Sequence, residues 1–117
     1  MAKSIQMHLE DMLQAISEIE MGVNRFGRQY DIFEKDVIFR RFVERNFEIL
    51  GEAINRTLKI QPDVKIMSAR KIAEAGNYVI KEYDSIKPDF LWEIVINHIP
   101  MLKAEVSKLL ESSQGES

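Results

Sequence analysis

The sequence predicts an all-α fold, an antiparallel bundle of four to five helices. Only five glycines and three prolines interrupt the 117 residues, and the apolar residues between them recur at helical spacing instead of alternating. A share of 45% hydrophobic and 30% charged residues is typical of a globular protein, and a chain of this length can enclose one core. We therefore expect one helical bundle over residues 1–111, followed by a disordered tail over residues 112–117.

The first helix is expected over about residues 4–25. Its apolar residues follow each other at steps of three and four, which keeps them on one side of a helix. This seam consists of Ile5, Leu9, Met12, Ile16, Ile19, Val23 and Phe26. It lasts about three heptads and stops at Gly27, which favours packing inside a compact bundle over a coiled coil.

A long second helix, near residues 32–58, is expected to start at a capping box. Asp31 is followed three residues later by Glu34, which is the spacing of that motif. Apolar side chains cover about half of this helix, enough for two neighbouring helices. Asn46 falls inside the apolar half, and if it is buried it needs hydrogen-bond partners, because an unsatisfied amide costs about 1–3 kcal/mol.

Three shorter helices complete the predicted bundle. The third, near residues 68–81, has Gly76 in its middle, where a glycine costs about 1 kcal/mol relative to alanine. This position either lies against another backbone or has lost a larger side chain. Pro88 and Pro100 suit the first turns of the fourth and fifth helices. Trp92 is expected to seal the core beneath the fourth helix.

The composition excludes several kinds of chemistry. The absence of cysteine removes disulfides, thiolate catalysis and cysteine-ligated zinc, and two histidines leave little for a metal site, so we expect neither a metal nor a cofactor. His8 is interpreted as solvated, and His98 as a local structural or capping residue. No apolar run approaches the roughly 20 residues of a membrane span and no signal peptide is recognisable, so a cytoplasmic protein without a membrane partner is expected.

The charge balance gives few indications of a nucleic-acid partner. The formal net charge is −3, and no contact with DNA is expected. Arg41 and Arg45 lie four residues apart on the charged half of the second helix. They are candidates for contact with RNA or a protein partner, and the alternative is a solvated face supported by neighbouring charge pairs.

Four segments carry a resemblance to a known family: ERNFEILGEAIN at residues 44–55, EYDSI at residues 82–86, Trp92, and the segment from Pro100 to Val106. In their order and spacing they resemble the HepT-like family over about residues 5–110. That family is associated with the toxin half of HepT/MNT toxin-antitoxin pairs. The resemblance implies a helical bundle that forms a homodimer, ribonuclease activity, and a nucleotidyltransferase antitoxin that neutralises the toxin by attaching AMP to a tyrosine.

The ribonuclease motif of the family is an arginine, a gap of four to six residues, a histidine, one further residue and a tyrosine. Tyr83 matches the tyrosine and is the candidate AMP acceptor, but Lys81 stands at the histidine position and Gly76 at the arginine position. A histidine can transfer protons near neutral pH and an arginine can hold a phosphate, whereas an ordinary lysine, with a pKa of about 10.4, is a poor proton acceptor. Lys81 and Asn77, which matches the asparagine that commonly follows the motif arginine, remain the candidate catalytic residues.

The resemblance and the altered motif together lead to one hypothesis and two alternatives. The hypothesis is a toxin-family protein with a degenerate motif that binds a nucleotidyltransferase antitoxin and a second copy of itself. The first alternative is an active ribonuclease toxin with a rearranged site. The second is the substrate-binding helical module of a two-component nucleotidyltransferase.

Overall fold

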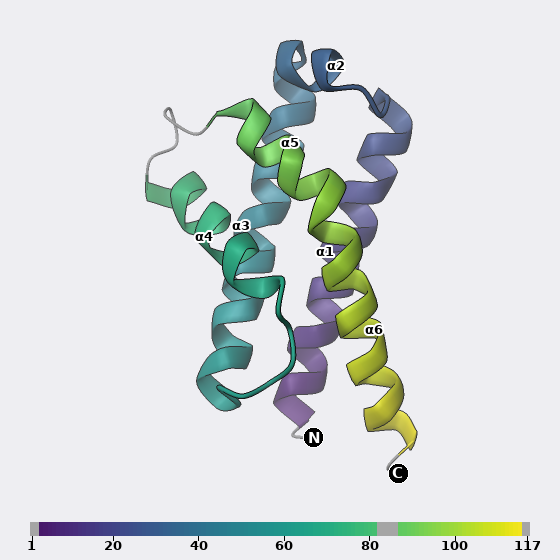
Figure 1. Cartoon of the computed structure of the whole chain (residues 1–117), viewed down its shortest axis with the longest axis vertical. Helices are drawn as coiled ribbons and strands as arrows, with labels where there is room; N and C mark the ends of the chain where they lie inside the picture. The colour runs from purple at the N-terminus through teal and green to yellow at the C-terminus, as the bar shows by residue number, and fades with distance from the viewer. Residues whose placement is uncertain (1–2, 82–86, 116–117) are drawn as a thin grey trace.

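The computed structural model describes residues 3–81 and 87–115, with side chains for residues 4–77 and 87–112. These residues form six helices and no strand (Figure 1), which confirms the all-α prediction. The helices are α1 (Lys3–Phe26), α2 (Tyr30–Lys35), α3 (Val37–Ile60), α4 (Ala69–Lys81), α5 (Pro88–Asn97) and α6 (Ile99–Gly115). Among the helices so described, none is both long and apolar enough to cross a membrane.

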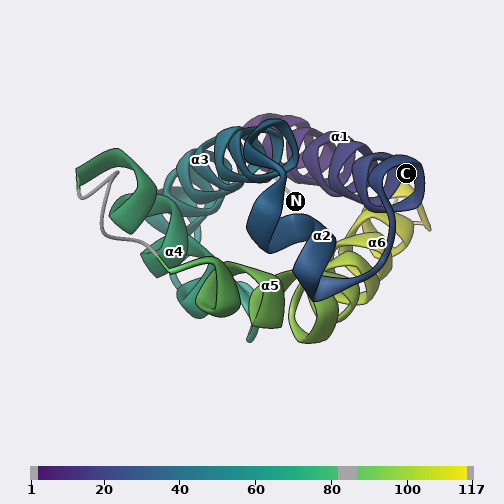
Figure 2. The same ribbon diagram turned by 90° about the horizontal axis from the view of Figure 1, so that it is seen from above.

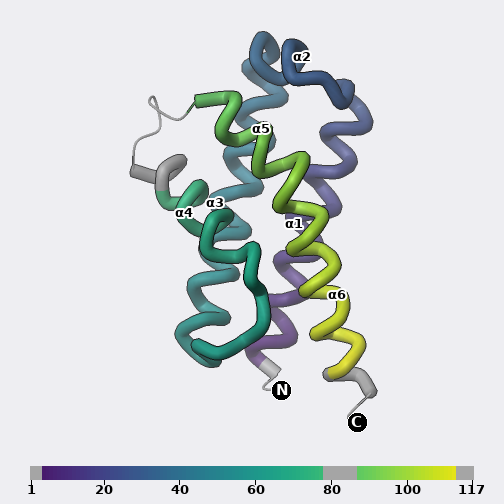
Figure 3. The backbone as a smooth tube through the Cα atoms, in the orientation of Figure 1, coloured from purple at the N-terminus to yellow at the C-terminus, as the bar shows by residue number. Residues whose placement is uncertain are grey.

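Three long helices, α1, α3 and α6, follow the long axis of an elongated bundle that measures 47 × 28 × 18 Å (Figure 1). Helix α3 packs against both α1 and α4, and α6 packs against both α1 and α5. Seen from above, α1 and α3 lie along one side of the bundle, while α4, α5 and α6 lie along the other (Figure 2). Helix α1 begins and α6 ends at the same end of the molecule (Figure 3).

The seam predicted on the first helix is the buried face of α1. Its residues from Ile5 to Val23 are at most 4% exposed, and each large apolar side chain buried in this way contributes about 1.5–3 kcal/mol. The helix ends at Gly27, whose φ of 117° lies in the left-handed region. The Gly27 N–H donates to the carbonyl oxygen of Val23 at 2.9 Å, which satisfies a carbonyl of the last turn.

The predicted second helix is two helices, so this part of the prediction is wrong. The break lies at Asp36, whose backbone is extended, with φ −92° and ψ 104°. Its Oδ1 accepts the N–H groups of Ile38 and Phe39 at 3.0 and 3.1 Å. These two donors have no partner within the first turn of α3, and the Asp36 side chain therefore starts a new helix where the apolar pattern predicts a continuous one.

The capping box predicted at Asp31 and Glu34 is also wrong. Asp31 lies inside the first turn of α2, and the residue before that helix, Gln29, makes no capping bond with its side chain. Glu34 instead accepts a hydrogen bond from the hydroxyl of Tyr30 at 3.3 Å. Partial burial and the neighbouring Glu34 carboxylate both raise the pKa of Tyr30.

Trp92 seals the core as predicted, and it does so where α2, α3 and α5 meet. Its ring centroid lies 5.1 Å from that of Phe33 on α2 and 6.0 Å from that of Phe39 on α3. Both phenylalanines are fully buried. Because ring pairs of this kind add about 0.5–1.5 kcal/mol beyond area burial, the short helix α2 is held by aromatic contacts.

Helices α5 and α6 meet at His98, which has the local structural role predicted for it. Its backbone N–H donates to the carbonyl oxygen of Ile94 at 2.9 Å, and its Nε2 lies 3.4 Å from Oε1 of Glu93. Helix α6 then continues to Gly115, beyond the boundary at residue 111 that the sequence predicts. No glycine or proline precedes Gly115 in the last turns of α6, so nothing in the residue types stops the helix earlier.

Candidate functional site

Helices α3 and α4 cross at two facing glycines, Gly51 and Gly76. A Cβ atom built on Gly76 would lie 2.7 Å from the carbonyl oxygen of Phe47 and 3.4 Å from Cα of Gly51. A Cβ built on Gly51 would meet Cα of Gly76 at 3.5 Å and the carbonyl oxygen of Ala73 at 3.7 Å, which are ordinary contacts. Of the two explanations that the sequence left open for Gly76, the close approach of another backbone is the correct one.

The direction of the missing side chain limits what residue 76 can do. The Cα–Cβ bond would point at the backbone of α3, so an arginine at this position could not be added without moving α4 away from α3. Even one extra methyl or methylene group in a packed interior costs about 1–3 kcal/mol. In this chain the packing of two helices requires a glycine where the family motif has its arginine.

A groove of about 330 Å³ lies beside this crossing, between α3 and α4. Both glycines form part of its wall, and the remaining lining is mostly polar. The polar lining residues are Arg45, Glu48, Glu52, Asn55, Arg56, Lys59 and Asn77. Three cationic side chains and two carboxylates therefore meet in one groove, which gives it a small excess of positive charge.

The cations of the groove differ in how they are paired. Arg45 donates to Glu48 at 3.3 Å, and Arg56 donates to Glu52 at 2.5 Å. Lys59 makes no ion pair with any residue that the structure describes. Exposed pairs of this kind are worth about 0.2–1 kcal/mol, so an anionic ligand could compete with the two glutamates at low cost.

The structure brings two of the predicted site residues, Arg45 and Asn77, into this groove. Both side chains are exposed, one on α3 and one on α4. Arg41 lies one turn before Arg45 and outside the lining of the groove, and its Nη1 donates to Oε1 of Glu44 at 2.9 Å. The pair of arginines predicted from the sequence is thus divided between two environments.

The other two predicted residues belong to the end of α4 and the segment after it. Lys81 is the last residue of α4, and its side chain lies outside the described residues. Tyr83 falls in the range 82–86, which the description of the structure does not include.

Two polar residues are more buried than their sequence positions indicate. Glu44, on the charged half of the predicted second helix, is 5% exposed, because α3 packs against both α1 and α4. His8, interpreted above as solvated, is 9% exposed, so that interpretation is wrong. Spacing alone gives no signal for either residue, since both lie at the edge of an apolar face.

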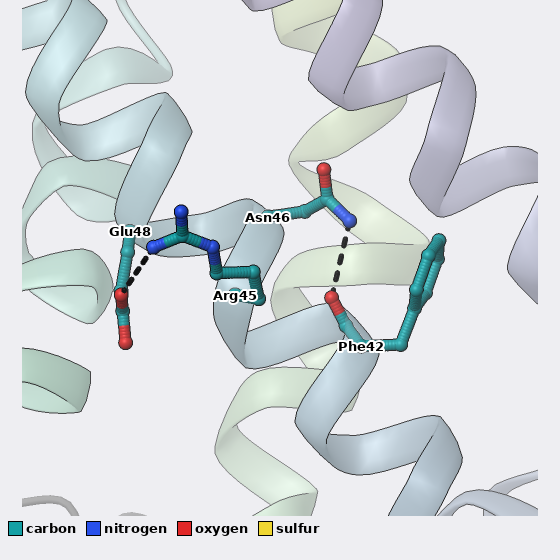
Figure 4. Close-up of polar contacts among 4 residues, drawn as sticks. All are labelled: Phe42, Arg45, Asn46 and Glu48. Atoms are coloured by element: carbon teal, nitrogen blue, oxygen red, sulfur yellow. Dashed lines mark hydrogen bonds and ion pairs between the residues drawn. The ribbon is translucent and has the colours of Figure 1, made fainter.

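Asn46 lies on the opposite side of α3 from Arg45 and Glu48 (Figure 4). It is 3% exposed, and its Nδ2 donates to the carbonyl oxygen of Phe42 at 3.1 Å. Its Oδ1 has no hydrogen-bond partner among the described residues. Asn46, which the sequence places in the apolar arc, is thus buried, and only half of its side-chain amide is satisfied.

Most of the chain is similar to a family of ribonucleases. The model of the family described as Ribonuclease HepT-like matches residues 12–109. A protein of Caldanaerobacter subterraneus subsp. tengcongensis named "Putative RNase" is 28% identical over 114 residues, which cover 96% of this chain and 99% of that protein. No solved structure shows a significant match.

Two proteins of Methanocaldococcus jannaschii are also similar to this chain. One, named "Gamma-glutamylcyclotransferase and putative RNase", is 29% identical over 112 residues, and the chain spans 50% of its length. The other, named "Putative RNase", is 26% identical over an alignment 118 positions long, which covers 97% of this chain and 93% of that protein.

Proposed function

Because the chain belongs to the ribonuclease HepT-like family, we propose that it is a member with a degenerate RNase motif that acts by binding. The partners in this proposal are a nucleotidyltransferase antitoxin of the MNT type and a second copy of the chain, which would form a homodimer. The place of action is the cytoplasm. The match to the family model over residues 12–109 gives the family, and the partners, the homodimer and the cytoplasm are what we propose in addition.

The observation that carries the proposal is the packing at Gly76. A phosphodiester-cleaving site of this family needs a cation on the phosphate and a group that transfers a proton. The Cβ position of residue 76 lies 2.7 Å from the oxygen of Phe47, so the first motif position has no room for a cation. Lys81 stands at the histidine position, and an ordinary lysine is a poor proton acceptor near neutral pH.

The remaining motif residue supports recognition by a partner. Tyr83 stands where the family carries the tyrosine that accepts AMP. A chain that has lost the cation and the histidine but retains this phenol would still offer the antitoxin its acceptor group. We therefore expect Tyr83 to carry AMP after co-expression with a nucleotidyltransferase encoded beside this chain.

Cleavage and modification can be tested on the same purified protein. Incubation with structured and unstructured RNA should give no more cleavage than buffer alone. Co-expression with the neighbouring nucleotidyltransferase should give a stable complex and an increase in intact mass by whole AMP units, and Tyr83→Phe should abolish the increase. Cleavage of RNA by the wild type that is lost in Lys81→Ala would overturn the proposal.

Ribonuclease activity with a rearranged site is the second candidate. The names of all three relatives include RNase, and the α3–α4 groove holds Arg45, Lys59 and Asn77, which could contact a phosphate. If this candidate is right, Asn77→Ala and Lys59→Ala should each lower the cleavage rate without changing the melting temperature.

Light scattering on the same purified protein would test the homodimer of the first proposal. A monomer at micromolar concentration would contradict it.

A further inference from the structure

A second groove, of about 210 Å³, lies between α1 and α3. It shares Ile49, Glu52 and Arg56 with the α3–α4 groove, so these three residues form the ridge of α3 that separates the two. Neither the RNase motif nor the residues proposed for partner binding contribute to it. Its lining differs from that of the α3–α4 groove in charge, in burial and in the presence of a histidine.

His8 is the most unusual side chain of this second groove. It lines the groove although it is only 9% exposed, and no hydrogen bond or ion pair joins it to any described residue. Neither ring nitrogen of His8 is fully enclosed by protein, so the imidazole keeps a narrow opening through which a bound group can hydrogen-bond to it. A nine-tenths buried imidazole that lines the groove and has no protein partner can hydrogen-bond to a group bound there.

The charge of the groove favours a cation. Asp11, Glu18 and Glu52 contribute three carboxylates, against the single guanidinium of Arg56. Glu52 and Arg56 are paired at 2.5 Å, which leaves Asp11 and Glu18 as carboxylates without a partner among the described residues. Two unpaired negative charges would repel a phosphate, so a nucleotide or an RNA backbone does not fit this groove.

The size and the floor of the groove restrict the ligand further. Ala15 and Ala53, with Ile49, provide an apolar surface between the charged groups. A volume of about 210 Å³ is below the roughly 300–1,000 Å³ of sites for drug-sized molecules. An alkyl chain that ends in an ammonium or guanidinium group combines an apolar stem with a cationic head, which is the pattern of the lining.

We propose that the α1–α3 groove binds an organic cation, an alkylammonium or alkylguanidinium group, between His8 and the carboxylates of Asp11 and Glu18. The alkyl stem lies on Ala15, Ala53 and Ile49, and a ring nitrogen of His8 accepts a hydrogen bond from the cationic head. The same chemistry is available from a free polyamine and from a lysine or arginine side chain of a protein partner. The inference is independent of the proposed function, because it uses none of the motif residues.

The chain provides its own reporter for this site, since His8 and His98 are its only histidines. The imidazole proton resonances are followed by NMR at pH 7.5 and constant ionic strength, during titration with putrescine or with capped arginine. A saturable shift of the His8 resonance, with His98 unchanged, is the expected result. Saturation by putrescine alone identifies a free polyamine, and saturation by capped arginine alone identifies a side chain of a partner. Absence of a saturable His8 shift with both probes at millimolar concentration overturns the proposal.

Two substitutions separate specific binding from general attraction to an acidic protein. Asp11→Asn and Glu18→Gln each remove one carboxylate that has no partner in the described structure, so the fold should be retained. Each should weaken binding about two- to fivefold, the factor expected for one partly exposed charge pair. Glu10→Gln removes the same charge next to Asp11 but outside the groove, and it should leave the affinity unchanged. Equal weakening by all three substitutions would refute a defined site.

Discussion

The side-chain oxygen of Asn46 is buried and has no hydrogen-bond partner among the described residues, although the side-chain nitrogen donates to the carbonyl oxygen of Phe42. A buried acceptor of this kind costs about 1–3 kcal/mol. The sequence shows that Asn46 lies in an apolar arc, where burial would require hydrogen-bond partners. The nitrogen is satisfied by a carbonyl oxygen one turn earlier on the same helix. A partner for the oxygen would have to come from a neighbouring helix, and spacing along one helix contains no information about it.

Asn46→Leu should stabilise the protein. The substitution removes the unsatisfied oxygen and replaces the amide by an apolar group of similar size, so the free energy of unfolding should rise by about 1 kcal/mol. Denaturant unfolding followed by circular dichroism measures this change. Asn55→Leu, at an exposed position of the same helix, is the matched control and should stay within about 0.5 kcal/mol of wild type. A marked loss of stability in Asn46→Leu would mean that the amide has a partner of its own.

At the scale of elements, the crossing of α3 and α4 depends on which of two glycines has room for a side chain. Both occur inside predicted helices. The structure distinguishes them, because the Cβ of residue 76 would meet a carbonyl oxygen while that of residue 51 would meet atoms at normal contact distance. The sequence predicts that Gly76 either lies against another backbone or has lost a larger side chain. Only the position of α3 shows that the opposing atom is the carbonyl oxygen of Phe47.

The two glycines should therefore respond differently to the same substitution. Gly76→Ala should destabilise the protein by about 1–3 kcal/mol, because the methyl group forces α4 away from the backbone of Phe47. Gly51→Ala should be neutral or stabilising by up to about 1 kcal/mol, since alanine is the better helix former. Thermal and denaturant unfolding of both variants checks this. If Gly76→Ala and Gly51→Ala changed the free energy of unfolding by the same amount, the two helices would separate easily at this crossing.

A second prediction at this scale concerns the start of α3. Asp36→Ala removes the acceptor of two backbone N–H groups and should cost about 0.5–2 kcal/mol, with loss of helical signal if α3 frays. Asp31→Ala is the control, since Asp31 lies within α2 and is not its N-cap. The sequence rules for helix starts favour Asp31, so a larger loss in Asp31→Ala would restore the capping box that the structure contradicts.

At the scale of the whole molecule, α6 closes the bundle by supplying an N-terminal cap to α4. The Glu105 carboxylate accepts the backbone N–H groups of Met67 and Ser68 at 2.7 and 3.2 Å, just before α4 begins. A carboxylate at this position also interacts favourably with the positive end of the helix. The contact joins residues that are 37 and 38 positions apart, so the loop before α4 is fixed by a helix near the end of the chain.

Glu105→Ala should lower the free energy of unfolding by about 1.5–3 kcal/mol, the range for hydrogen bonds to a charged group. Glu20→Ala is the matched control: Glu20 also joins two helices, by its ion pair with Lys103 on α6, but that pair is about half exposed. An exposed pair contributes at most about 1 kcal/mol. Chemical denaturation of both variants gives the comparison, and a Glu20→Ala loss as large as that of Glu105→Ala would contradict the capping role.

The sequence by itself determined the all-α class, the buried seam of α1, the position of Asn46 in an apolar arc, and the start of α5 at Pro88. Each of these follows from periodicity or backbone chemistry within one segment. Only the tertiary structure decided that Asp36 starts a new helix, that His8 is buried, and that Gly76 touches the backbone of α3. The burial of His8 and the contact of Gly76 depend on which atoms of distant segments come together, whereas Asp36 caps α3 through residues two and three positions away. The same packing explains why the position of the motif arginine holds a glycine, which single-helix geometry could not reveal.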